Sequence, residues 1–96
     1  MRTLHLTIKK EWFDKIASGE KTIEYREYKP YWISRLETFL TYGCEKIIFR
    51  NGYKKDSPTI TASLLVIRRI ENGMRTDLKI HGPVFGLWFE VLEVRR

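Results

Sequence analysis

A change of hydrophobic period near the N-terminus is the sequence feature that most restricts the fold of this chain. Residues 4–8 alternate apolar and polar side chains, which is typical of a half-buried strand. From Lys10 onward the apolar residues recur at helical spacing and fall on one helix face. Gly19 then favours the left-handed backbone conformation that ends many helices. The sequence therefore predicts a strand over 4–8, followed by a helix of about two turns from Lys10 to Ser18.

A second alternating segment, residues 22–26, follows the predicted helix. Successive side chains of a strand point to opposite faces. Glu24 and Arg26 should therefore share one face with Thr22, while Tyr25 points the other way. We expect Tyr25 to be a core residue on this basis.

The rest of the chain predicts one more helix and three more strands. Pro30 suits the first turn of a helix, and Gly43 closes it. The helix would bury Trp32 or Ile33, then Leu36, then Phe39 or Leu40. The other predicted segments are a buried strand at 47–49, a basic loop at 51–58, a strand at 59–70 with a hairpin signal at Asn72-Gly73, and a closing strand at 84–94. We expect a single domain over residues 1–96, α+β in class, mostly antiparallel and forming a partly open barrel.

Composition limits the kinds of protein that the chain can be. It is 43% apolar and 14% aromatic, which favours a packed core over disorder. No apolar run approaches the ~18 residues of a membrane span, and the N-terminus lacks the apolar block of a signal peptide, so we expect a cytoplasmic protein without membrane partners. The net charge of +6 favours anionic partners, nucleic acid first, although a basic surface can also serve solubility alone.

Most familiar catalytic and metal-binding signatures are missing from the sequence. It contains no phosphate-binding glycine loop and no nucleophile elbow, and two histidines with one cysteine do not make a zinc pattern. We therefore predict neither a metal nor a cofactor. Cys44 cannot form an intrachain disulfide and is interpreted as a small buried hydrophobe; a nucleophilic thiol would need His5 or His81 nearby. His81 itself, before Gly82-Pro83, is interpreted as a loop residue rather than a general base.

The stretch from Gly19 to Arg26 is the strongest candidate for a functional site. It sets a lysine, a glutamate and an arginine beside a glycine that lets backbone approach. Such a cluster can hold a phosphate through Lys21 and Arg26, while Glu24 accepts a hydrogen bond from a base or a sugar hydroxyl. The alternative interpretation is a structural ion pair between Glu24 and Arg26, two residues apart on one strand face.

The strand, the helix and the spacing Gly19-x-Lys21-x-x-Glu24-x-Arg26 together resemble the ASCH family of the PUA-like superfamily, whose hallmark is G-x-K-x-x-E-x-R after the first helix. All four positions match, and the order of the later segments also fits, so the resemblance spans essentially the whole chain. It implies a small PUA-like β-barrel with two flanking helices and a cleft into which Lys21, Glu24 and Arg26 project. It also implies binding of RNA or a nucleotide-like ligand.

Some relatives implied by this resemblance are hydrolases. Bacterial members remove the acetyl group from acetylcytidine with a lysine equivalent to Lys21, a threonine nucleophile and a more distant glutamate, and one relative is a ribonuclease. Here Glu24 occupies the position of the threonine, so the expected nucleophile is missing; Thr22 lies nearby on the same strand face. Glu71 and Glu90 are both candidates for the distant carboxylate. Binding is therefore the favoured function.

Aromatic residues on loops could stack on a base, and Tyr28, Tyr31, Trp32 and Tyr53 are the candidates. Tyr53 is preferred, because Lys54 and Lys55 follow it and could track a nucleic-acid backbone. Three hypotheses remain open: a binding module for RNA or a nucleotide that uses Lys21, Glu24, Arg26, Tyr53, Lys54 and Lys55; a hydrolase with Lys21 and Glu24 as catalytic groups; or a protein-interaction domain in which the cluster is structural. The sequence does not predict the oligomeric state.

Overall fold

The computed structural model describes residues 2–43 and 45–96, so the interpretation of Cys44 concerns a residue outside the described part of the chain. Strands and helices alternate at first and are followed by three strands in a row. In chain order the elements are β1 (Thr3–Thr7), α1 (Lys10–Ala17), β2 (Ile23–Glu27), α2 (Pro30–Tyr42), β3 (Lys46–Arg50), β4 (Thr59–Ile70) and β5 (Val84–Arg95).

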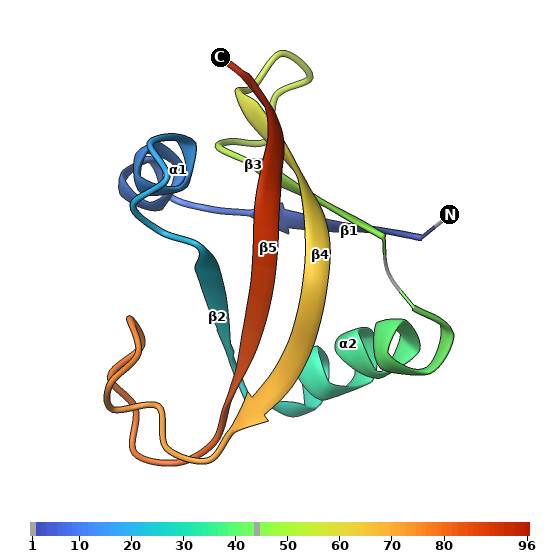
Figure 1. Ribbon diagram of the computed structural model, residues 1–96, viewed down its shortest axis with the longest axis vertical. Coiled ribbons are helices and arrows are strands. Elements are labelled where there is room, and N and C mark those ends of the chain that lie inside the picture. Colours follow the sequence, from blue (N-terminus) through green and yellow to red (C-terminus); the bar gives the residue numbers. More distant parts are fainter. Residues whose placement is uncertain (1, 44) are drawn as a thin grey trace.

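The five strands form one mixed sheet that curls into a half-barrel (Figure 1). Their order is β1-β3-β4-β5-β2, so the first two strands of the chain become the two edges. Only β1 and β3 pair in parallel; the other three pairs are antiparallel. The predicted α+β class, with two helices and a mostly antiparallel, partly open barrel, is confirmed.

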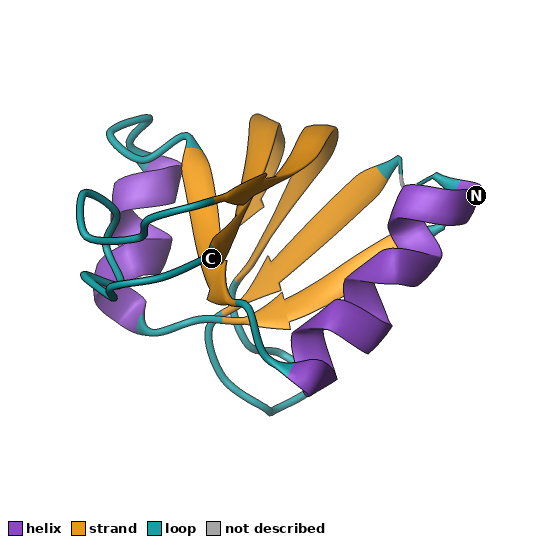
Figure 2. Cartoon of the chain, turned by 90° about the horizontal axis from the view of Figure 1, so that it is seen from below, coloured by secondary structure: helices purple, strands orange, loops and turns teal. Residues whose placement is uncertain are grey.

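The core lies inside the curl of the sheet and is built from alternate residues of β1, β3, β4 and β5, whereas β2 contributes no residue to it. Both helices contribute to it, and they lie on opposite sides of the strands (Figure 2). Phe49 and Phe89 meet inside with ring centroids 4.9 Å apart. The largest fully buried side chains are Leu4, Leu6, Phe13, Ile16, Leu36, Ile47, Phe49, Ile60, Val84 and Leu87.

The second helix resolves the alternatives that its sequence left open. Leu36 is fully buried, and Trp32, Ile33 and Phe39 pack against the core, whereas Leu40 is 54% exposed. The helix begins at Pro30 and is capped by Gly43, as the positions of this proline and this glycine predict.

The connection between β4 and β5 is longer than a tight hairpin. Asn72-Gly73 suggests a short turn, but residues 71–83 form an extended loop. Gly73 donates its N–H to the Gly82 carbonyl at 2.8 Å and pairs with Ile80, while Thr76 is buried within the loop. The loop is therefore a folded structure, and it reaches the open side of the half-barrel.

Within residues 2–43 and 45–96, no helix is long and apolar enough to cross a membrane.

Candidate functional site

The open side of the half-barrel contains a cleft of about 280 Å³. It lies between the two edge strands, with Thr7 of β1 on one side and Glu24 and Arg26 of β2 on the other. The Arg26 Nη2 group reaches across it to the Thr7 carbonyl at 3.5 Å. Trp12 of α1 and Trp32 of α2 also line the cleft.

The backbone turn after α1 places Lys21 at this cleft. Gly19 has a φ of +85°, the left-handed conformation that lets the chain leave the helix at once. The Lys21 N–H then donates to the Lys15 carbonyl at 3.0 Å, which holds the turn against the last helical residues. Lys21 is only 8% exposed as a result.

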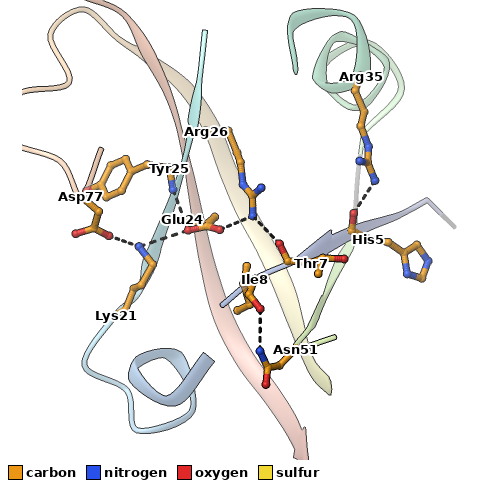
Figure 3. Close-up of polar contacts among 10 residues, drawn as sticks. All are labelled: His5, Thr7, Ile8, Lys21, Glu24, Tyr25, Arg26, Arg35, Asn51 and Asp77. Atoms are coloured by element: carbon orange, nitrogen blue, oxygen red, sulfur yellow. Dashed lines mark hydrogen bonds and ion pairs between the residues drawn. The ribbon is translucent and has the colours of Figure 1, made fainter. Parts of the chain in front are cut away.

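Lys21, Glu24 and Arg26 form one connected network (Figure 3). The Lys21 Nζ lies 3.5 Å from Glu24 Oε1, and Arg26 Nη2 donates to Glu24 Oε2 at 2.7 Å. The Tyr25 backbone N–H also donates to Glu24 Oε1, at 3.2 Å. A second carboxylate completes the network, because Lys21 Nζ donates to Asp77 Oδ2 of the β4–β5 loop. Both oxygens of the buried Glu24 carboxylate are thus engaged.

Aromatic rings flank both cations of the network. The Lys21 Nζ lies 5.1 Å from the Trp12 ring centroid and 5.0 Å from that of Tyr25, and the Arg26 guanidinium carbon lies 4.9 Å from the Trp32 centroid. These are cation–π distances. The Arg26 Nε is buried and meets no acceptor among the described residues, so this guanidinium retains an unused donor.

Burial raises the pKa of the Tyr25 hydroxyl, and the nearby Asp77 carboxylate raises it further. Desolvation disfavours the phenolate, and a neighbouring negative charge acts in the same direction. Tyr25 is therefore a neutral hydrogen-bonding group at the edge of the cleft at physiological pH.

The charges that line the cleft balance. Three side chains are cationic and three are anionic: Lys9, Lys21, Arg26, Glu24, Glu27 and Asp77. The cleft thus offers many donors and acceptors without a strong field of either sign.

The structure brings together Lys21, Glu24 and Arg26, three of the residues that the sequence selected. The other three, Tyr53, Lys54 and Lys55, lie on the loop between β3 and β4 and are not among the described residues that line the cleft. Tyr53 is 91% exposed and is therefore not held against any base-sized pocket. Its selection rested on loop composition, which does not say where a loop lies.

Asp77 is the site residue that sequence reasoning missed. It is the only acidic residue between Asn72 and Val84, but nothing in its spacing links it to Lys21. The two carboxylates that were considered lie elsewhere: Glu71 pairs with Arg69, and Glu90 is exposed on β5.

The expectation that Tyr25 is a core residue is wrong. It is only partly buried, and its ring lies at the cleft beside Lys21. β2 is an edge strand and contributes no residue to the core, so the core does not cover Tyr25. Trp12, assigned to the apolar face of the first helix, also lines the cleft.

The remaining candidates fall outside the cleft. Tyr28 packs on Phe85, with ring centroids 5.0 Å apart, and Tyr31 packs edge-on against Trp32, also at 5.0 Å. Thr22 and His5 are exposed, and His81 lies in the β4–β5 loop as expected. Among the described residues, no three His, Cys, Asp or Glu side chains are grouped as metal ligands.

The sequence matches no protein-family model and no curated protein with which it was compared. The function is therefore inferred from the geometry of the cleft and from the spacing of its residues.

Proposed function

We propose that the cleft binds a nucleotide-like ligand, such as an unpaired base of RNA, and that the chain is an RNA-binding domain of the ASCH type. The observation that supports this most directly is the partly buried network of Lys21, Glu24 and Arg26 at an open cleft with aromatic walls. The four spaced positions from Gly19 to Arg26 are those of the family that the sequence resembles.

The contents of the cleft suit a base better than a phosphate. Lys21 and Arg26 already face carboxylates, so neither cation is available to an anion without breaking an ion pair. A base is flat, apolar on its faces and polar at its edges. Trp12, Trp32 and Tyr25 supply aromatic surface, and stacking of a base on an aromatic ring contributes about 1–3 kcal/mol. The unused Arg26 Nε can donate to an edge acceptor.

Binding should depend on the network and on salt. Lys21→Ala and Arg26→Ala are each expected to weaken binding of a short single-stranded RNA at least about tenfold. That is the effect of losing one charged hydrogen bond, either to the ligand or within the network that orders the cleft. Fluorescence anisotropy with labelled RNA over a series of NaCl concentrations measures the affinity. Arg68→Ala is the matched control, because Arg68 is exposed and lies on β4 away from the cleft lining.

The comparison is meaningful only for folded variants, so thermal melts accompany it. If folded Lys21→Ala and Arg26→Ala proteins bind RNA as tightly as Arg68→Ala does, the cleft is not the RNA-binding site.

A hydrolase acting on RNA or on a modified nucleoside is the second candidate, favoured by the contact between Asp77 and Lys21. The resemblance implies a carboxylate distant in sequence, and Asp77 lies 56 positions from Lys21. Glu24 is a poor general base, since both its oxygens are engaged. Asp77, with a side chain 37% exposed, is the better acceptor for a proton of water. Lys21 faces two carboxylates, and the third N–H of its ammonium group can donate to the developing oxyanion without breaking either pair.

Acetylcytidine tests this second candidate. Water would add across its amide bond, and the products would be acetate and cytidine, which mass spectrometry detects. Asp77→Asn and Lys21→Ala should each abolish turnover while Glu71→Gln does not. The absence of product from acetylcytidine, and of cleavage of unstructured RNA, would exclude the hydrolase.

A further inference from the structure

A second hollow, of about 540 Å³, lies on the outer face of the sheet at the end where β3 and β4 meet their loop. Arg50 of β3 is opposite Thr59 of β4, and Thr59 is opposite Arg95 of β5. Directly opposed residues of neighbouring strands share a face. The floor of the hollow therefore carries a row in which two guanidinium groups flank a threonine hydroxyl. We call this hollow the basic groove.

The basic groove carries an excess of positive charge that the cleft lacks. Its lining includes four cationic side chains and two anionic ones: Arg50, Lys55, Arg95, Arg96, Asp56 and Glu93. Arg96 Nη1 pairs with Asp14 Oδ1 of α1 at 3.2 Å, so the excess positive charge of the groove rests on Arg50, Lys55 and Arg95. Arg95 has a side chain 79% exposed and lies 3.8 Å from Glu93, and exposed pairs of that kind contribute little. Arg50 donates to the Lys54 carbonyl at 3.3 Å, a contact that orients its guanidinium without neutralising it.

The groove and the cleft are neighbours across one backbone hydrogen bond. Ile8 lines the cleft and Arg50 lines the groove, and the Ile8 N–H donates to the Arg50 carbonyl at 2.9 Å. Asn51 strengthens the connection, because its Nδ2 donates to the Ile8 carbonyl at 3.0 Å (Figure 3). Lys9, the next residue, lines the cleft. Thr7, which also lines the cleft, is the register partner of Arg50, so the cleft and the basic groove approach each other at this end of β1 and β3.

We propose that the basic groove binds backbone phosphates of the same single-stranded RNA whose base occupies the cleft, so that the ligand is a strand rather than a free nucleotide. This proposal rests on the proposed function. It assigns to the groove the phosphate contacts that the cleft, with equal numbers of positive and negative side chains, does not provide. Guanidinium groups with adjacent hydroxyls are suited to phosphate oxygens. Proteins that bind single-stranded RNA commonly combine cationic side chains along the backbone with aromatic side chains on which the bases stack.

Salt dependence of RNA affinity tests the groove. The variant Lys55→Gln with Arg95→Gln removes two of its charges, and Arg68→Gln with Arg75→Gln removes two exposed charges elsewhere. With a single-stranded RNA of about 12 nucleotides, a length within known site sizes, loss of two phosphate contacts should make the negative slope of log K against log salt shallower by about 1.4. A slope equal to that of the control variant would overturn the proposal.

Amide chemical shifts separate this proposal from the proposed function. The RNA should shift the amides of Thr59, Thr61 and Arg95, whereas a mixture of nucleosides, which carry no phosphate, should shift those of Lys21 and Arg26 and leave the groove unchanged. Stationary groove amides with RNA would refute the strand contact alone. Stationary cleft amides with both ligands would refute base binding in the cleft alone. Equal groove shifts with RNA and with the same concentration of inorganic phosphate would also overturn the proposal, because the groove would then be a simple anion site.

Discussion

Glu24 accounts for the arrangement of two cations at once. It is 7% exposed, and its carboxylate faces Lys21 on one oxygen and Arg26 on the other. We expect Glu24→Gln to reduce the free energy of unfolding by about 1.5–3 kcal/mol, because a charged hydrogen bond is lost within a partly buried site and both cations lose their shared counter-charge. Urea unfolding at neutral pH measures the change.

Glu27→Gln is the matched control, since it makes the same chemical change on the same strand. Glu27 pairs with Lys29 at 3.0 Å, and their side chains are 42% and 63% exposed, so the loss of this pair should cost less than about 0.5 kcal/mol. Equal effects of the two substitutions would mean that Glu24 does not organise the cluster. A purely structural cluster would show the Glu24 effect without any stabilisation of the protein by nucleotides in a thermal melt.

Tyr25 reports on its surroundings through its hydroxyl. Because burial and Asp77 raise its pKa in the folded protein, the phenolate should form above the usual value near 10.0. The unfolded chain then loses this proton first, so the contribution of Tyr25 to stability is intact below about pH 10 and is lost as the pH rises through the folded pKa.

The difference between ultraviolet titrations of the protein and of Tyr25→Phe isolates this group. In the titration of Asp77→Asn, the Tyr25 pKa should fall only part of the way back, since burial is the larger cause. A Tyr25 pKa at or below 10.0 would contradict the position of the ring beside Asp77.

At the scale of elements, the end of α1 fixes where the site begins. Gly19 has a positive φ, and a Cβ added there would meet nothing within 4 Å. Gly19→Ala should therefore cost about 1 kcal/mol of stability through backbone strain alone. Differential scanning calorimetry measures it. Gly19→Asn should cost less, because asparagine tolerates the left-handed conformation; an equal or larger loss for asparagine would contradict this explanation.

The helix itself is explained by local pattern, and its surroundings are not. Phe13 and Ile16 are buried on one face of α1, as helical spacing predicts. Trp12 lies beside Phe13 in sequence and packs against the core, but it also lines the cleft. That role depends on β2 and the β4–β5 loop, which approach from other parts of the chain.

At the scale of the whole molecule, one contact joins the β4–β5 loop to the site. Asp77 meets Lys21 across 56 positions of sequence. Asp77→Asn should loosen this end of the loop, so amide hydrogen exchange should rise at Leu78, whereas the Gly73 amide, bonded to the Gly82 carbonyl at 2.8 Å, stays protected.

Mass spectrometry or NMR measures this exchange. His81→Asn, in the same loop, is the control and should leave exchange at Leu78 unchanged. No difference between the two variants would mean that the Asp77 contact does not hold the loop.

Much of the fold could be predicted because the apolar residues of each helix and strand recur with the period of that element. β4 runs from Thr59 to Ile70 as predicted, and the other elements begin or end within about two residues of their predicted bounds. The pairing of strands could not be derived in the same way. β1 lies beside β3 and β2 beside β5, which makes the first two strands the edges of a half-barrel with a cleft between them.

The sequence by itself determined that Lys21, Glu24 and Arg26 would come together, because a glycine turn and a period of two fix their relative positions within six residues. Only the tertiary structure decided what surrounds them. It added Asp77 and Trp12, moved Tyr25 from the expected core to the cleft, and left Tyr53, Lys54 and Lys55 outside it. The physical reason is that local geometry follows from backbone preferences, whereas contacts between distant segments follow from how the sheet curls to bury its core.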